Sequence, residues 1–214
     1  MIKAVIFDLD GTVGNTLPLC IAAFRKAIEP LSGKQLSDQD IIDTFGPSEE
    51  GTIMALAPDH YDCALKAYLA HYEAMHDMCP APFDGIGEIL RMLRNRGITV
   101  AMVTGKGPLS CTITLNKYGL SGLFDMVETG SPLGPMKPEG IQKVLDCYGL
   151  SPGEAVYVGD TPSDIISSRR VGIPVIAAAW AATSDADGLR AMSPDHLFSS
   201  TGELRTFLEG ITDK

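Results

Sequence analysis

Residues 2–12 read IKAVIFDLDGT, and this stretch decides the fold. Its first part, IKAVIFD (2–8), is nearly all apolar and rich in β-branched residues, which is typical of a strand buried on both faces. Similar apolar runs recur at 98–104, 155–159 and 173–178. Helical stripes of apolar residues lie between these runs, at Ile86, Ile89, Leu90 and Leu93 and at Ile141, Val144, Leu145 and Tyr148. The alternation predicts an α/β fold, a parallel sheet covered by helices.

The segment from about residue 15 to 80 breaks this rhythm, because it carries no strand signal. It holds two apolar helical stripes, Leu17, Ile21, Phe24 and Ile28, and then Tyr61, Leu65, Tyr68, Tyr72 and Met75. We interpret the Tyr and Met stripe as packing core and not as a ligand box. Between the stripes, Ser37 and Asp40 resemble a capping box at the start of a short helix. The sequence therefore predicts an all-α unit inserted after the first strand, with CPAPFDG (79–85) as the return linker.

Length and composition restrict the class of protein. The 214 residues suffice for one sizeable core and a smaller appended unit. Hydrophobic residues make up 45% and charged residues 21%, as in ordinary globular proteins. We find neither an apolar run long enough to span a bilayer nor a signal peptide at the N-terminus, so we expect a cytoplasmic protein. A net charge of −10 disfavours nucleic acid and anionic membranes as partners.

Cysteine and histidine give no catalytic or metal signal. The five cysteines are scattered and form no CxxC pair, so we expect buried or half-buried free thiols in place of disulfides, a zinc site or a catalytic thiol. The four histidines also lack the spacing of metal ligands.

Two carboxylates follow the first strand, in the turn Asp8-Leu9-Asp10-Gly11-Thr12. In an extended segment Asp8 and Asp10 point to one side, where they repel each other unless a cation or a shared proton compensates. The carboxyl ends of parallel strands are also where open α/β sheets bind ligands. A strand cap followed by an Asp-Gly turn would explain this pentapeptide alone, but not the features that follow.

Two further features suit a phosphate. Thr104-Gly105-Lys106 ends the second strand, where a hydroxyl and backbone N–H groups before a helix can bind phosphate oxygens, although Thr-Gly is also a common turn. Lys137 precedes Pro138, a residue that fits the first position of a helix. This position would hold the lysine at the rim of the sheet, whereas an exposed loop lysine is the plain alternative.

The stretch GDTPSD (159–164) adds two more acids after the apolar run at 155–159. Helix capping by Asp160, with Asp164 in the first turn, would explain each residue separately. It would not explain why four carboxylates converge on one edge of a sheet. Hard oxygen ligands in that arrangement suit Mg²⁺.

The set of motifs resembles the haloacid dehalogenase-like hydrolase superfamily. All four motifs occur in order, as DLDGT (8–12), Thr104 in VTGK, Lys137 in KPEG, and GDTPSD (159–164). Together with the helical insert, the chain looks like the branch of phosphoglycolate phosphatases. The resemblance implies a Rossmann-like core at residues 1–14 and 82–214, with helices on both faces of the sheet, and a helical cap at residues 15–81.

The resemblance also implies roles for individual residues. Asp8 is expected to be the nucleophile and a Mg²⁺ ligand, and Asp10 the general acid/base, which also gives its backbone carbonyl to the metal. Asp160 and Asp164 would ligate the metal or orient its waters. Phosphate binding is expected at Gly11, Thr12, Thr104, Gly105 and Lys137, with Thr104 and Lys137 also counted as catalytic. Asn15 and Gly105 depart from residues common in this superfamily, Asp and Asn respectively, which bears on substrate choice more than on reaction class.

The segment Phe45-Gly46-Pro47-Ser48-Glu49 lies between the expected cap helices and could reach the site, with Gly46 near the substrate. A plain turn with Ser48 as helix N-cap is the alternative reading. The cap, residues 15–81, holds four Lys/Arg and ten Asp/Glu, which argues against a long polyanion as leaving group.

These observations favour a Mg²⁺-dependent phosphatase acting on a small phosphorylated metabolite, with phosphoglycolate first by resemblance. An inorganic pyrophosphatase and a sugar phosphomutase of the same branch are the alternatives, and a non-catalytic binding or regulatory protein is the alternative of another class. Haloacid dehalogenation and phosphonate cleavage are disfavoured. We expect a monomer or a homodimer.

Overall fold

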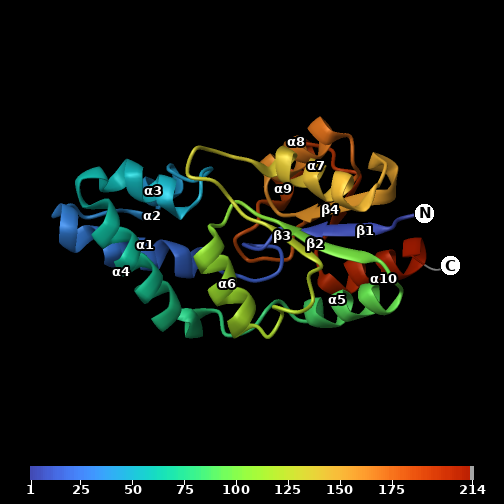
Figure 1. The fold of residues 1–214 in the computed structure, drawn as a ribbon, viewed down its shortest axis with the longest axis horizontal. Coiled ribbons are helices and arrows are strands. Elements are labelled where there is room, and N and C mark those ends of the chain that lie inside the picture. The colour runs from blue at the N-terminus through green and yellow to red at the C-terminus, as the bar shows by residue number, and fades with distance from the viewer. Residues whose placement is uncertain (213–214) are drawn as a thin grey trace.

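A computed structural model describes residues 1–212 of the chain, and its centre is a parallel sheet with the strand order β3-β2-β1-β4-β5-β6 (Figure 1). The strands are β1 (Ala4–Phe7), β2 (Thr99–Val103), β3 (Met126–Glu128), β4 (Ala155–Gly159), β5 (Val175–Ala178) and β6 (His196–Phe198). The four apolar runs became β1, β2, β4 and β5. The sequence did not reveal β3 and β6, because both are three-residue strands at the sheet edges, where side chains are half-buried or exposed.

Helices cover both faces of the sheet, and the strand residues alternate between them. In β1, Val5 and Phe7 pack with α5 (Ile86–Asn95), α6 (Pro108–Lys117) and α10 (Thr201–Thr212). Ala4 and Ile6 pack on the opposite face with α7 (Lys137–Tyr148), α8 (Pro162–Val171) and α9 (Ala186–Ala191). Both faces of β1 are therefore buried, as its apolar run predicts. The stripe on α7 is correct for its first three residues and wrong for Tyr148, which is exposed at the end of the helix.

The segment between β1 and α5 forms a separate group of helices at one end of the sheet (Figure 1). These cap helices are α1 (Leu17–Ser32), α2 (Asp38–Ile42), α3 (Glu49–Leu56) and α4 (Tyr61–Ala74), with short 3₁₀ turns at Pro58–His60 and His76–Met78. They enclose their own apolar core, in which Phe24 stacks on Tyr68 at 4.2 Å between ring centroids. Tyr68 and Tyr72 are fully buried there, so the aromatic stripe is packing core as predicted. Ser37 and Asp40 form the predicted capping box.

The predicted fold class is confirmed, since a parallel sheet with helices on both faces carries a helical insert after its first strand. The chain at 79–85 contains neither helix nor strand and leads back from the cap helices to α5. All five cysteines are free, but only Cys20, Cys79 and Cys111 are buried. The expectation was wrong for Cys63 and Cys147, which lie on exposed helix faces. No helix within residues 1–212 combines the length and the apolar character that crossing a membrane requires.

Candidate active site

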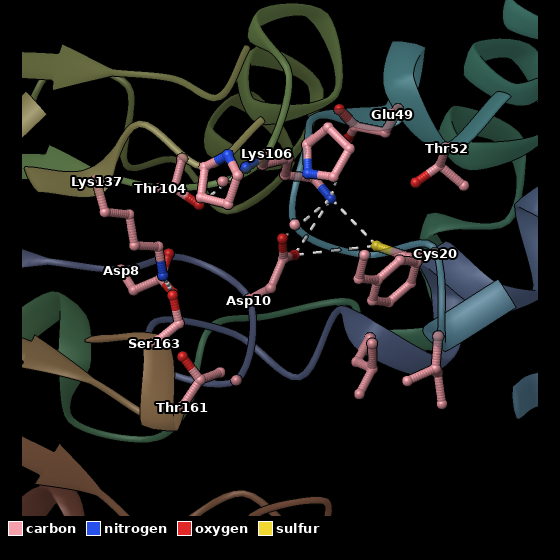
Figure 2. Close-up of a pocket in the computed structure, with 18 of the residues that line it drawn as sticks. Asp8, Asp10, Cys20, Glu49, Thr52, Thr104, Lys106, Lys137, Thr161 and Ser163 are labelled. Atoms are coloured by element: carbon pink, nitrogen blue, oxygen red, sulfur yellow. Dashed lines mark hydrogen bonds and ion pairs between the residues drawn. The ribbon is translucent and has the colours of Figure 1, made fainter. Parts of the chain in front are cut away.

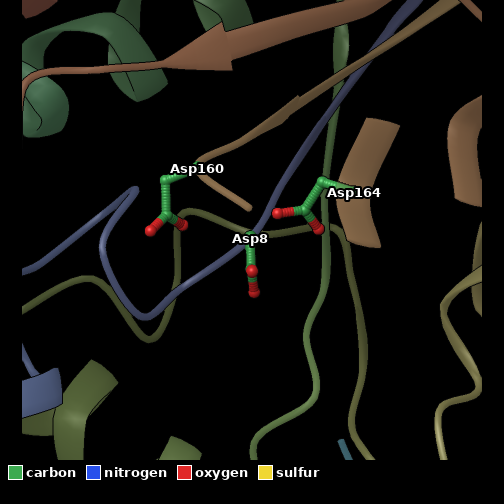
Figure 3. A group of neighbouring side chains, drawn as sticks. All are labelled: Asp8, Asp160 and Asp164. Atoms are coloured by element: carbon green, nitrogen blue, oxygen red, sulfur yellow. The ribbon is translucent and has the colours of Figure 1, made fainter. Parts of the chain in front are cut away.

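The strand order reverses at β1, which has β2 on one side and β4 on the other. Such a switch point opens a crevice at the carboxyl ends of the strands. Asp8 follows β1, Asp160 follows β4, and Asp164 lies in the first turn of α8. One carboxylate oxygen from each of the three lies within 4.8 Å of the others (Figure 3). The sheet thus brings together three of the four acids that the sequence singled out.

The turn after β1 lets the chain pass close to Asp160. The Leu9 carbonyl accepts hydrogen bonds from the N–H groups of Thr12, Val13 and Gly14, which closes the turn. Gly11 has a φ of 79°, a left-handed conformation that favours glycine, and a Cβ there would lie 2.0 Å from Asp160 Oδ2. Gly11 therefore serves both the turn and the approach of the carboxylate.

Lys137 joins two of the acids. As the first residue of α7, it places Nζ 2.5 Å from Asp8 Oδ2 and 2.5 Å from Asp164 Oδ1. The other oxygen of Asp164 accepts hydrogen bonds from the N–H and the hydroxyl of Thr161, which is the true N-cap of α8. The alternative that Asp160 caps this helix is therefore wrong, because Asp160 lies one residue before the N-cap and faces Asp8.

The electrostatics of this cluster call for a further cation. Burial raises the pKa of Asp8 to about 6, even though Lys137 acts to lower it. Burial and then the charges of Asp8 and Asp164 also raise the pKa of Asp160 well above its usual value. Burial disfavours the Lys137 ammonium, but Asp164 and Asp8 outweigh that effect and raise its pKa. One lysine cannot neutralise three carboxylates, and three converging hard oxygens fit Mg²⁺.

A second lysine, Lys106, lies beside Asp10 and is buried. Lys106 Nζ is 3.2 Å from Asp10 Oδ1, 3.6 Å from Glu49 Oε1 and 3.2 Å from Cys20 Sγ (Figure 2). The Thr16 hydroxyl also donates a hydrogen bond to Asp10. Burial disfavours the Lys106 ammonium, but Asp10 together with Cys20, Tyr72 and Tyr68 outweighs this effect and raises the lysine pKa well above its usual value. Asp8 and Asp10 therefore each bind a different lysine.

Glu49 connects this second cluster to the cap helices. It is the first residue of α3, and its carboxylate accepts hydrogen bonds from the Gly107 N–H and the Ser110 hydroxyl at the start of α6. The neighbouring Ser48 N–H donates to the Ser131 carbonyl at 2.9 Å. Through these bonds the start of α3 is attached to the sheet and the helices that cover it, which we call the sheet unit.

Sequence reasoning missed Lys106, Glu49, Thr16 and Cys20 as site residues. Lys106 stands directly after Thr104-Gly105, and Glu49 closes the segment 45–49 that was expected to reach the site. Those two positions were the available signal. Nothing in the local pattern shows that the two side chains meet, because they are 57 positions apart and belong to different units.

A cavity of about 410 Å³ lies between the cap helices and the carboxyl edge of the sheet. Asp8 and Lys137 lie toward one end, Asp10 lies in the middle, and Cys20 and Thr52 lie toward the other (Figure 2). The expected phosphate-binding residues that line it are Gly11, Gly46, Thr104, Gly105 and Lys137. Thr12 is not among the lining residues, because its hydroxyl points to Asp160 Oδ1 at 2.9 Å.

Comparison with known proteins points to the family that the sequence motifs resemble. The family model described as haloacid dehalogenase-like hydrolase matches residues 5–178. The pyrophosphatase PpaX of Bacillus pumilus is 31% identical over 205 residues, which cover 95% of this chain and 94% of that protein.

Two solved structures show the same fold. A predicted phosphoglycolate phosphatase from Haemophilus somnus superimposes with a TM-score of 0.80 at 21% identity, covering 96% of this chain and 97% of that one. CbbY from Rhodobacter sphaeroides, solved in complex with phosphate, gives 0.79 at 19% identity, with coverages of 95% and 96%.

Proposed function

Because the chain belongs to the haloacid dehalogenase-like hydrolase family, we propose that it hydrolyses a small phosphomonoester through an aspartyl-phosphate on Asp8, with Mg²⁺ as cofactor. The chain is an enzyme of the phosphatase type. The observation that carries the proposal is the cluster of Asp8, Asp160 and Asp164 at the switch point of the sheet, with Lys137 bonded to two of the three acids.

Asp8 is the proposed nucleophile. One of its carboxylate oxygens attacks phosphorus, a P–O bond to Asp8 forms, and the bond to the leaving alkoxide breaks. Asp10, at the middle of the pocket, gives the alkoxide a proton and then takes one from the water that hydrolyses the phospho-aspartate. Two adjacent acids with different lysine partners are thereby assigned to two different tasks.

The other residues bind and neutralise the phosphoryl group. Thr104, Gly105 and Gly11 line the pocket beside Asp8, where a hydroxyl and backbone N–H groups can donate to phosphoryl oxygens. Lys137 supplies a fixed positive charge. Asp8, Asp160, Asp164 and the Asp10 backbone carbonyl would hold Mg²⁺, which when bound offsets the repulsion between the nucleophile and the phosphate.

Two substrates are suggested by the names of similar proteins, namely phosphoglycolate and inorganic pyrophosphate. Pyrophosphate is the second candidate because the 31% identical relative is called a pyrophosphatase. The sugar phosphomutase alternative is tested by incubation with a hexose 1-phosphate, since isomerised sugar without free phosphate would contradict a hydrolase.

We also propose that residues 15–81 act as a cap domain over a core formed by 1–14 and 82–214. Its support is that the cap helices enclose an apolar core of their own and border the pocket. The cytoplasmic location and the monomeric or dimeric state stay predictions.

The direct test is phosphate release from a chromogenic aryl phosphate, measured with Mg²⁺ and again with excess EDTA, followed by a panel of phosphorylated metabolites. We expect Mg²⁺-dependent release. Absence of release from every ester would contradict the proposal and favour a binding protein on this fold.

A further inference from the structure

The positively charged side chains of the pocket already form ion pairs with acids of the protein. Among the described residues, the lysines and arginines that line it are Lys106 and Lys137. Lys137 is paired with Asp8 and Asp164, and Lys106 with Asp10 and Glu49. Each lysine therefore faces two carboxylates, and neither has charge to spare for an anionic group on the leaving side of a substrate.

The cap helices supply no further cation to the pocket. Residues 15–81 contain Arg25, Lys26, Lys34 and Lys66, and none of the four lines the cavity. Arg25 instead donates hydrogen bonds to the Leu36 carbonyl and to Asp38. The acid that the cap does contribute, Glu49, makes this end of the pocket more negative.

Apolar side chains fill the rest of the cap side. From the cap these are Leu17, Phe24, Ile42, Phe45 and Pro47, and Pro135 and Met136 join them from the loop before α7. Three of them are large and yet solvent-exposed, Ile42 at 36%, Phe45 at 38% and Met136 at 43%. Exposed apolar side chains that gather on one cavity are typical of a ligand-binding surface. Here they adjoin the residues proposed to carry the reaction.

From these two observations we propose that the pocket selects phosphomonoesters whose leaving alcohol is uncharged and apolar, an aryl or branched alkyl group. The inference rests on the proposed function and narrows its substrate class. A carboxylate or a second phosphate on the leaving group would lie near Glu49 without a counterion, where a charge is costly to desolvate. Apolar carbon in the same place gains free energy by leaving water. Phosphoglycolate and pyrophosphate are therefore poor substrates compared with neutral esters.

The test compares esters that match in size and differ in charge. We would measure kcat/KM for phenyl phosphate against 4-carboxyphenyl phosphate, with 4-carbamoylphenyl phosphate as the neutral control, and for phosphoglycolamide against phosphoglycolate. We expect the neutral ester of each pair to be preferred by at least about tenfold, since a charge beside Glu49 is placed unfavourably and must lose its hydration. The carbamoyl compound separates charge from the size and electron withdrawal of the substituent.

A charge-insertion variant tests the same idea from the protein side. In Phe45→Arg the preference for neutral esters should fall toward unity, because the new guanidinium pairs with the anionic group. Met54→Arg is the matched control, since Met54 lies on α3, is 54% exposed and does not line the pocket. The control should keep the preference of the wild-type enzyme.

Binding of phosphonates separates this inference from the proposed function. Benzylphosphonate and phosphonoacetate are not hydrolysed, so calorimetric Kd values in the presence of Mg²⁺ report leaving-group preference without turnover. Tighter binding of benzylphosphonate supports the inference even if no ester is hydrolysed, which would overturn the proposed function alone. Equal or tighter binding of phosphonoacetate, or a preference for charged esters in turnover, overturns the inference and leaves the hydrolase proposal standing.

Discussion

Two lysines border one pocket, and the difference between them shows how the molecule is built. Lys137 binds Asp8 and Asp164, which both belong to the sheet unit and lie at its switch point. Lys106 binds Asp10 from the sheet unit and Glu49 from the cap helices. The first cluster is complete within the sheet unit, whereas the second needs the cap helices in place. The ion pairs of the first cluster therefore lie within the sheet unit, whereas those of the second join the cap helices to the sheet unit beside Asp10, the proposed general acid/base.

The largest effect should come from the first cluster. Asp8→Asn removes the proposed nucleophile while keeping its shape, and we expect phosphate release to fall by at least about 10⁴-fold. Asp59→Asn, an exposed acid on the cap helices, is the control and should retain full activity. Undiminished turnover in Asp8→Asn would refute the assignment of the nucleophile.

Lys137→Met should lower kcat by about 10²–10³-fold, the range found when one charge-stabilising group is removed. Lys143→Met is a matched control on the same helix, because Lys143 is 65% exposed and pairs with Glu128 away from the pocket. Circular dichroism should show both variants folded. Equal activity of the two variants would show that the lysine at the sheet edge plays no part in the reaction.

Removing the lysine of the second cluster should lower stability, because this lysine pairs with acids of both the sheet unit and the cap helices. Lys106→Met leaves Asp10 and Glu49 without their shared cation, and we expect a loss of about 3 kcal/mol in the free energy of unfolding, the low end for a broken buried pair because Asp10 is partly exposed. Glu49→Gln keeps an acceptor for Gly107 and Ser110 and should cost only about 1 kcal/mol.

Urea unfolding measures both of these changes, with Lys117→Met, an exposed residue of α6, as the control. If Lys106→Met proves as stable as this control, the attachment of the cap helices does not depend on the ion pair.

The smallest effect concerns pH. The pKa of Asp8 is raised from 3.8 to about 6, so between these values the folded chain binds a proton more tightly than the unfolded chain does. The metal-free protein should therefore lose stability as pH rises from about 4 to 6. Mg²⁺ competes with that proton, so Mg²⁺ should raise Tm more at pH 7.5 than at pH 5. Each kcal/mol that Mg²⁺ adds to the free energy of unfolding corresponds to a rise in Tm of about 2–4 °C. A rise in Tm that is equal at both pH values would contradict this linkage.

Much of the first cluster could be predicted from the sequence. Asp8 and Asp160 each stand at the end of an apolar run that predicts a strand, and Asp164 follows Asp160 by one helical turn. Parallel strands necessarily bring their carboxyl ends to one edge. The neighbouring Pro138 was informative about Lys137 as well, because it indicates a helix start there, although the helix begins at Lys137 and not at the proline. The short edge strands β3 and β6 were not predictable, because half-exposed strands of three residues carry no apolar signature.

The sequence by itself determined the alternation of strands and helices, the helical insert and the acids at the sheet edge, since these depend on local pattern and on a topology with few solutions. Tertiary structure alone decided that Lys106 meets Glu49, that Asp8 and Asp10 take different lysines, and that apolar cap residues enclose the pocket. The physical reason is that these contacts join side chains far apart in sequence. Their energies depend on burial and distance, which arise only when the cap helices pack against the sheet.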